Sequence, residues 1–245
     1  MQQLINKRAI RKWHRYLGLF LGIQFLLWTI GGLYFSWTRI EQVRGDDLKQ
    51  APLPLLLDSA VVSPAMAITA LPPAYRTHVE QCQLIRLPGG LCYQIVYKME
   101  KELSVYLIDA LSGKRRAPLS REEAIAVALE KAGHNGEVKE VRYLTATGKQ
   151  HEYRNKPLPV WAVELGAGVN TTVYVSSEWG TVQSFRNYSW RIFDFLWMLH
   201  TMDYEGRDNF NNWLLRIVSV VGLLTVLSGF ALFFVSRKRK TRMNI

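Results

Sequence analysis

Two long apolar segments lie near the two ends of the chain. Residues 16–37 contain 22 residues without a charged side chain, and residues 213–235 contain 23 residues with the single charge of Arg216. A helix rises about 1.5 Å per residue, so each segment is long enough to cross the roughly 30 Å hydrocarbon layer of a bilayer. We therefore predict two transmembrane helices. A signal peptide is the alternative for the first segment, but its apolar core is too long and no small-x-small cleavage site follows it.

The segment between the two spans is residues 38–212. Its larger part, residues 38–189, is predicted to be one domain and contains runs that alternate between apolar and polar positions as half-buried strands do. Residues 79–87 and 91–99 flank Pro88-Gly89-Gly90, a sequence typical of a hairpin turn. Further strands are expected over residues 103–109, 137–145, 160–165, 171–176 and 181–185.

A helix is expected among these strands, over residues 120–133. Ser120 is its predicted N-cap, Glu123 stands at the capping-box position and Gly133 ends the apolar pattern. A second, shorter helix is expected over residues 63–71.

The strand segments also repeat. The run LPGGLCYQIVY aligns with KPLPVWAVEL, and SVYLIDALSGK aligns with TVYVSSEWGTV, which indicates two copies of one helix-plus-hairpins unit, at residues 60–118 and 119–187. Residues 190–212 are expected to form an amphipathic helix in the membrane interface, followed by a loop. The predicted fold class is an α+β membrane protein, in which two transmembrane helices flank helices packed on antiparallel sheets.

The formal net charge of +11 would suit a nucleic-acid-binding protein if it were spread over a folded surface. The excess instead lies at the two ends, residues 1–15 and 236–245, which carry five basic residues each and no acidic residue: Lys7, Arg8, Arg11, Lys12 and Arg15, then Arg237, Lys238, Arg239, Lys240 and Arg242. Apart from Arg216, the other 20 basic residues balance the 20 acidic ones. The positive-inside rule therefore places both termini in the cytoplasm and the central segment outside. No nucleic-acid partner is expected.

Several motifs resemble one family. The run SREEAIAVALEKAG, the strand after it, PVWAVEL and VYVSSEWGTV resemble a PepSY domain. His14-Arg15-x-x-Gly18 resembles the HR-x-x-G opening of the PepSY-associated transmembrane family, and Trp197-Met198-Leu199-His200 resembles its W-x-L-H element. The resemblance covers nearly the whole chain. It implies a bacterial inner-membrane protein with a periplasmic PepSY-like domain.

Members of that family are associated with iron acquisition, and some are similar to haem-binding reductases of ferric siderophores. The resemblance implies that His14 and His200 are axial ligands of haem b, with Gly18 and Gly22 letting the macrocycle approach the helix backbone. The alternatives are a polar anchor for His14 and an interfacial, water-facing side chain for His200. Arg216 either snorkels outward or pairs with a haem propionate beside His200. This chain has two predicted spans where the larger reductases have four or more, so a self-sufficient reductase does not follow.

The predicted topology puts His14 and His200 at opposite faces of the bilayer, so they cannot hold the same iron. Asp203 is expected to accept the second N–H of His200. A second axial ligand would come from another copy of the chain, from a partner subunit, or from Met198 or Met202. The Gly18-x-x-x-Gly22 motif favours a homodimer. A larger membrane complex, packed against Gly222, Ser228 and Gly229, is the alternative.

The expected function is haem-linked electron transfer for iron or ferric-siderophore reduction and uptake, either as a ferric reductase or as an electron-transfer subunit. The alternatives are an accessory subunit and a non-catalytic tethered module, resembling a peptidase inhibitor, that offers strand edges within residues 160–185 to a periplasmic protein. No catalytic residue is assigned, because no hydrolase, P-loop or dinucleotide motif occurs.

The other histidines and the two cysteines give weaker signals. His78, His134 and His151 are isolated in the sequence without the spacing of a zinc site, so we expect them at the surface. Cys82 and Cys92 flank the predicted hairpin, and the sequence leaves a disulfide open. A turn centred on Pro88-Gly89 would place Ile85, rather than Cys82, opposite Cys92.

Overall fold

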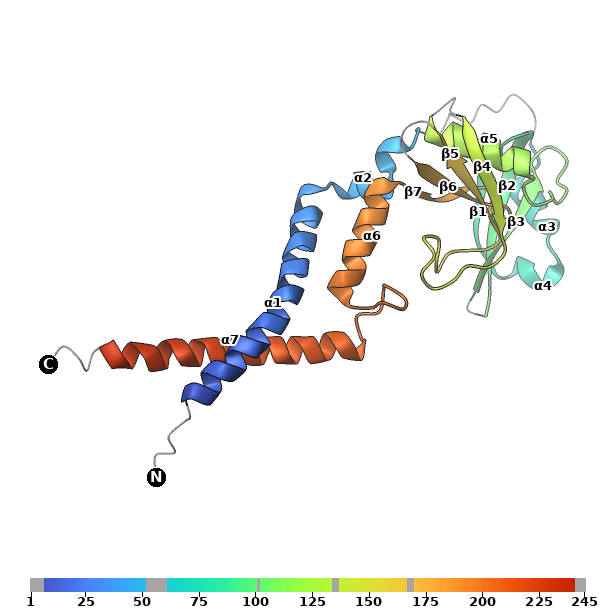
Figure 1. Ribbon diagram of the computed structural model, residues 1–245. Helices are drawn as coiled ribbons and strands as arrows, with labels where there is room; N and C mark the ends of the chain where they lie inside the picture. The colour runs from blue at the N-terminus through green and yellow to red at the C-terminus, as the bar shows by residue number, and fades with distance from the viewer. Residues whose placement is uncertain (1–6, 52–60, 101, 134–136, 167–169, 241–245) are drawn as a thin grey trace. The chain divides into compact units, whose positions relative to one another are not determined.

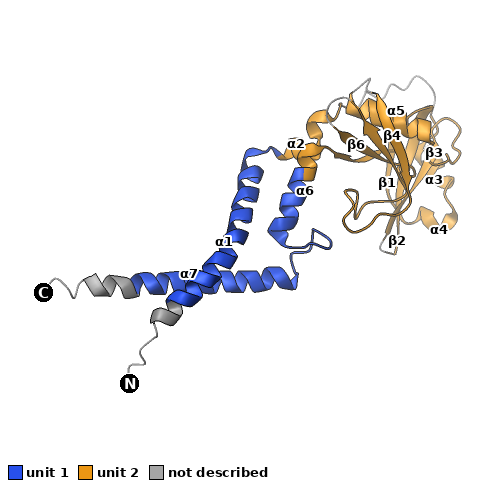
Figure 2. Cartoon of the chain, viewed as in Figure 1, with its two compact units in different colours: residues 1–39, 192–245 blue, residues 40–191 orange. Residues whose placement is uncertain are grey.

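The computed structural model describes residues 7–51, 61–100, 102–133, 137–166 and 170–240. The chain forms two compact units, residues 1–39 with 192–245 and residues 40–191 (Figure 2). The first unit contains the long apolar helices, and the second contains all the strands that the structure describes (Figure 1).

The first unit is built on α1 (Lys7–Trp37) and α7 (Trp213–Lys240). Within them, Arg11–Trp37 and Trp213–Phe234 are long and apolar enough to cross a membrane. Their outward side chains are large and apolar, and Leu19, Phe20 and Phe230 are 60–69% exposed. Such continuous apolar surface is stable in lipid rather than in water. The two predicted transmembrane helices are confirmed, and the chain is a membrane protein.

The second unit contains two antiparallel sheets. The first sheet has the order β1 (Val79–Leu87), β2 (Gly90–Met99), β3 (Glu102–Asp109). The second has the order β4 (Val138–Leu144), β5 (Val160–Leu165), β6 (Thr171–Ser176), β7 (Val182–Arg186). The hairpins β2–β3 and β5–β6 come from the segments that the sequence repeat aligns. The α+β fold class is therefore confirmed, whereas the predicted unit boundary at residues 118 and 119 stays a prediction.

Helix α5 (Arg121–Ala132) begins and ends where the capping signals predict. Ser120 accepts a hydrogen bond from the backbone N–H of Glu123, whose carboxylate accepts one from the Ser120 N–H in return. Gly133 ends the helix in the left-handed region, with φ of +61°. The buried side of α5 packs with one face of each sheet in the main core, whose members include Val127, Ala128, Leu107, Val163 and Phe185.

A second core covers the other face of the first sheet. The predicted helix over residues 63–71 is present as α3 (Pro64–Thr69), which is followed by α4 (Pro73–Arg76). Ala67 and Leu71 pack there against Tyr93, Ile95 and Ile108. The two sheets are also joined directly, because Gln94 Nε2 of β2 donates a 2.6 Å hydrogen bond to the carbonyl oxygen of Trp179, in the turn after β6.

The chain enters the second unit through α2 (Ile40–Arg44) and the short 3-10 helix η1 (Asp46–Leu48). Gly45 between them has φ of +70°, and a Cβ atom at this position would lie 2.8 Å from the Cβ of Phe185. Asn187, just after β7, donates a hydrogen bond of 2.8 Å from Nδ2 to the carbonyl oxygen of Gln42. The points of entry and exit of this unit are therefore directly bonded to each other.

Cys82 and Cys92 are both free thiols. Ile85 pairs with Cys92 across the β1–β2 hairpin, as the turn predicts, and Cys82 pairs with Ile95. Ile95 belongs to the core under α3 and α4, whereas Cys92 belongs to the main core with α5. The two thiols thus lie on opposite faces of the sheet, which excludes a disulfide in this register.

The predicted interaction edge within residues 160–185 is wrong for most of its length. β5 and β6 are interior strands, each hydrogen-bonded to neighbours on both sides. Their backbone groups are used within the sheet and cannot accept another strand. The edge strands are β1, β3, β4 and β7.

Candidate functional site

His14 lies on α1 and is held by α7. Its Nδ1 atom is 2.7 Å from Ser228 Oγ, and Ser228 Oγ in turn donates a 2.7 Å hydrogen bond to the carbonyl oxygen of Thr225. Because the only proton of the Ser228 hydroxyl is in the hydrogen bond to the Thr225 carbonyl oxygen, Ser228 Oγ acts as the acceptor toward His14. This assigns the proton of the neutral imidazole to Nδ1 and leaves the lone pair on Nε2, the form that binds a metal.

The α1 surface beside His14 is open. A Cβ atom added at Gly18 or at Gly22 would meet no atom within 4 Å, whereas one at Gly229 of α7 would lie 3.4 Å from His14 Cε1. His14 itself is half-buried. The imidazole is therefore fixed on the α7 side, and the glycine surface one and two turns along α1 is free for a flat ligand or another helix.

His200 lies on α6 (Tyr188–Thr201) among aromatic rings of α1 and α6. Its ring centroid is 5.6 Å from that of Trp28 and 6.2 Å from those of Phe35 and Trp197. The indole N–H of Trp28 is buried and has no hydrogen-bond partner in the described part of the chain. This aromatic cluster thus retains one buried, unpaired donor beside His200, which is itself exposed.

His200 is placed along α1 by the packing of helix α6, and the predicted position of this helix in the membrane interface stays a prediction. Successive residues of α6 contact α1 from its end toward its middle: Phe193 packs on Phe35, and the carbonyl oxygen of Leu199 accepts a 3.1 Å hydrogen bond from Gln24 Nε2. Helix α6 therefore runs beside the second half of α1. Its aromatic side chains pack on the rings of α1.

This arrangement places His200 beside the middle of the α1 span rather than at its end. His200 lies against Trp28, which follows His14 by 14 residues, so the two histidines are separated by about 21 Å along α1. That is less than the full bilayer thickness, but it is still too far for both imidazoles to bind one iron. The two half-sites for haem stay a prediction.

Asp203 is not the partner of His200, contrary to our expectation. Its carboxylate accepts backbone N–H groups of Glu205, Gly206 and Asn209, at 3.3, 3.1 and 2.9 Å. Burial by itself would raise the pKa of Asp203, but these N–H donors outweigh it and lower the pKa. Asp203 therefore closes the turn between α6 and α7. An aspartate just after a helix has a short side chain, which reaches backbone N–H groups of the following turn more readily than the ring of His200, three residues earlier.

The remaining candidate residues from the sequence, which are Arg216, two methionines and three histidines, differ in their burial. Arg216 is exposed, and its guanidinium forms no ion pair with any residue that the structure describes. Met202 is buried with Leu21 and Val218, while Met198 is half-buried. Among the described residues, no group of three or more metal-binding side chains occurs. His134 lies outside the described residues; His78 is exposed and His151 half-buried.

The small residues of α7 that the larger-complex alternative names contact α1 of the same chain, and that alternative stays a prediction. A Cβ atom at Gly222 would lie 3.7 Å from the Phe25 ring of α1, and Ser228 and Gly229 face His14. These residues allow α1 and α7 to pack closely within one chain.

Ser228, Gln24 and Trp28 were not identified from the sequence as parts of the sites. A signal was available, because polar side chains inside apolar spans usually bond to one another or to backbone carbonyls. Which polar side chains would meet depends on how the helices cross, and hydrophobicity does not determine this.

The two histidine motifs and the sheet domain between the spans agree with one family. The family model described as the PepSY-associated TM region matches residues 11–244. No curated protein and no solved structure matches the chain. The match includes both histidines, both spans and the whole second unit, so the chain belongs to the family of the PepSY-associated TM region.

Proposed function

We propose that this PepSY-domain membrane protein is a haem-b-linked electron-transfer protein that serves iron or ferric-siderophore reduction and uptake. His14 and His200 are the axial ligands of two separate half-sites. Haem b bound there would supply reversible one-electron transfer. The protein lies in the bacterial inner membrane, with both termini in the cytoplasm and the second unit in the periplasm.

The observation that carries the proposal is the hydrogen-bonded chain from His14 through Ser228 to Thr225. It orients the imidazole and keeps Nε2 available, which is how outer-shell groups prepare a histidine for a metal. The open surface at Gly18 and Gly22 gives a macrocycle access to the backbone.

The second half-site has weaker but independent support. The exposed ring of His200 and the unpaired indole N–H of Trp28 leave a potential ligand and a donor within one aromatic cluster. The guanidinium of Arg216 would form an ion pair with a haem propionate. Each half-site needs one more axial ligand, and the open glycine surface of α1 favours a second copy of the chain as its source.

The test is the absorption spectrum of detergent-purified protein from haem-replete cells. We expect a Soret band and reduced-minus-oxidised α-band features. His14→Ala and His200→Ala should each remove part of the absorbance, and the double variant should remove nearly all of it. His78→Ala is the matched control, since its ring is exposed in the second unit and bonds only nearby groups, including the Ala74 carbonyl.

A colourless preparation of the unmodified protein would overturn the haem proposal. So would a double variant that retains the full Soret band. In either case the family assignment would stand, because it does not depend on a cofactor.

A further inference from the structure

The edge strand β3 already accepts one short strand from its own chain. Ile108 and Arg115 form an isolated antiparallel bridge. On either side of this bridge the Arg116 N–H donates to the carbonyl oxygen of Leu107, and the Asp109 N–H donates to that of Lys114, both at 2.8 Å. The backbone groups of Leu107 and Asp109 therefore point away from β2.

Because this direction alternates along a strand, Val105 and Leu103 also direct their N–H and C=O groups outward. No backbone bond to these outward groups occurs within the part of the chain that the structure describes. The chain leaves the edge at Pro118, which has no N–H, and Leu119 bonds instead to the carbonyl oxygen of Ser177 at 2.8 Å. The first half of the β3 edge is therefore unpaired.

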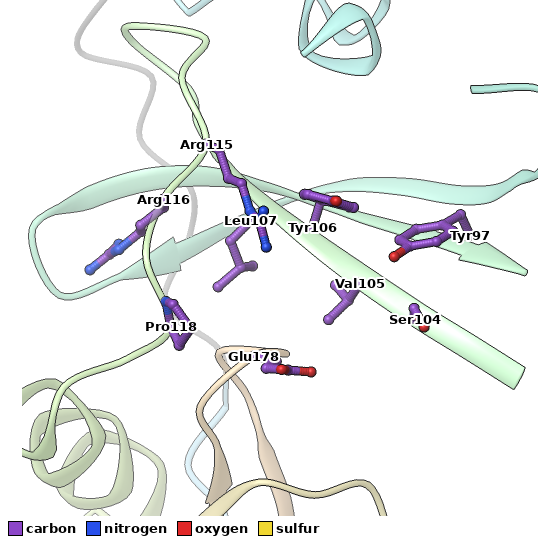
Figure 3. Close-up of a pocket in the computed structure, with 9 residues that line it drawn as sticks. All are labelled: Tyr97, Ser104, Val105, Tyr106, Leu107, Arg115, Arg116, Pro118 and Glu178. Atoms are coloured by element: carbon purple, nitrogen blue, oxygen red, sulfur yellow. The ribbon is translucent and has the colours of Figure 1, made fainter. Parts of the chain in front are cut away.

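A groove of about 250 Å³ lies along this unpaired edge (Figure 3). The backbone of residues 104–107 forms its floor, with Tyr97 and Tyr106 at one side and Glu178 at the other. The two tyrosine rings are 5.4 Å apart, and Tyr97 also stacks on Tyr75 at 4.9 Å. The volume is below that of a usual cofactor pocket and suits the side chains of a short peptide.

The charges in the groove favour a single carboxylate. Arg116 is engaged, because its guanidinium pairs with Glu123 and donates to the carbonyl oxygen of Pro88 at 2.5 Å. Arg115 is held with its guanidinium carbon 4.3 Å from the Tyr106 ring centroid and forms no ion pair with a described residue. Glu178 on the far side would repel a second acidic group.

We propose that this groove binds a short extended peptide, which adds to the first sheet along Leu103 and Val105 and places one carboxylate on Arg115. Backbone hydrogen bonds to the edge would give affinity, and the tyrosines and Arg115 would give selectivity. A free C-terminus reaches Arg115 if the peptide runs parallel to β3, whereas an acidic side chain reaches it in either direction.

The test uses fluorescence anisotropy with three fluorescein-labelled peptides and the full chain in detergent. The peptides are Thr-Val-Thr-Val-Thr with a free C-terminus, the same peptide amidated, and an amidated version ending in Glu. We expect at least one carboxylate-bearing peptide to bind about tenfold more tightly than the neutral one, since a charge-assisted hydrogen bond is lost in the latter. Tighter binding of the peptide with a free C-terminus would identify a C-terminal carboxylate as the ligand of Arg115. Tighter binding of the amidated peptide ending in Glu would identify an acidic side chain.

Two variants, with a third as control, separate the contribution of the Arg115 side chain from that of the β3 backbone. Arg115→Ala should reduce binding of the carboxylate peptide to the level of the neutral one, and Lys114→Ala, which removes a neighbouring charge outside the groove, should leave it unchanged. Val105→Pro removes an outward N–H that the sheet does not use, so binding should be lost while far-UV circular dichroism is retained.

A further control leaves the protein unaltered. The same peptide with N-methylated alternate amides cannot form the ladder and should not bind. Absence of saturable binding of every peptide at millimolar concentration would overturn the proposal, as would binding that survives both N-methylation and Arg115→Ala. The haem spectrum reports the separate histidine sites, so failure here leaves the electron-transfer proposal unaffected.

Discussion

The proton on His14 is assigned by one hydroxyl group on a neighbouring helix. The Ser228 hydroxyl donates its one hydrogen bond to the carbonyl oxygen of Thr225, so the imidazole must be the donor to Ser228 and carry its proton on Nδ1. The family motif in the sequence indicates His14 as a candidate ligand, but it does not show which ring nitrogen is available. That information depends on the contact between α1 and α7.

Removing the Ser228 hydroxyl should therefore change the tautomer of His14. We expect the nitrogen NMR shifts of His14 in labelled protein to indicate protonation at Nδ1, and Ser228→Ala to produce a mixture of both tautomers. Ser219→Ala is the control, because the Ser219 hydroxyl also donates a hydrogen bond to a carbonyl oxygen in its own helix, that of Leu215, whereas His14 bonds to Ser228. A predominantly Nε2-protonated ring in the unmodified protein would contradict the assignment.

Glu123 connects the cap of α5 to the groove beside β3. Burial alone would raise its pKa from the usual 4.5, but hydrogen bonds from Ser120 and Arg116 outweigh burial and lower the pKa. The ionised form is thus stabilised by folding. Its contribution to stability is present above pH 4.5 and is lost as the pH falls through the lowered pKa of the folded state.

Glu123→Gln should reduce the free energy of unfolding by about 1 kcal/mol at neutral pH, since it removes the charge in the Arg116 pair. The difference from the unmodified protein should close in acid, where Glu123 is protonated. Denaturant titrations of the full chain across this pH range measure the effect. Glu122→Gln on the same turn is the control, because the Glu122 side chain is 77% exposed; a pH-independent difference for Glu123→Gln would contradict the argument.

At the scale of elements, local signals predicted the strands and α5 well. β1 and β5 have the expected bounds, and the capping box of Ser120 and Glu123 starts α5. These elements are specified by short-range alternation and capping. Helix α6 was predicted as a helix but not in its place beside α1, because an amphipathic pattern shows that one face is apolar without showing what covers it.

The junction between α2 and η1 gives a prediction of its own. Gly45→Ala combines a positive φ with a Cβ atom 2.8 Å from Phe185, so we expect a loss of about 1–3 kcal/mol in the free energy of unfolding. Thermal unfolding followed by circular dichroism measures it. Gly148→Ala, where an added Cβ meets nothing within 4 Å, should have little effect. Equal stability of the two variants would show that the junction is not constrained.

For the whole molecule, hydrophobicity and the repeat predicted two spans around an α+β domain. The family motifs added the two histidines. Neither hydrophobicity nor the repeat predicted the order of the strands in each sheet. As a result, the strand edge expected to bind a partner within residues 160–185 falls mostly on the interior strands β5 and β6. Local patterns specify strands, whereas the choice of an edge depends on pairing between distant segments.

The distribution of charge predicts the topology. Alkaline phosphatase fused after Asn187 should be active, because it would be exported with the second unit, and a fusion after the last residue should be inactive. Green fluorescent protein at the same two positions should give the opposite result, with fluorescence only at the C-terminus. An active phosphatase at the C-terminus would reverse the predicted orientation.

The hydrogen bond between Asn187 and Gln42 holds the two ends of the sheet-containing unit next to each other, so this unit has the geometry of an exchangeable insert. An insert whose two ends meet can be exchanged without stretching or twisting the host chain that receives it. The region between Gln42 and Asn187 is thus suited to being cut out and grafted between an unrelated pair of helices, and the native helices are equally suited to carrying a foreign domain in its place.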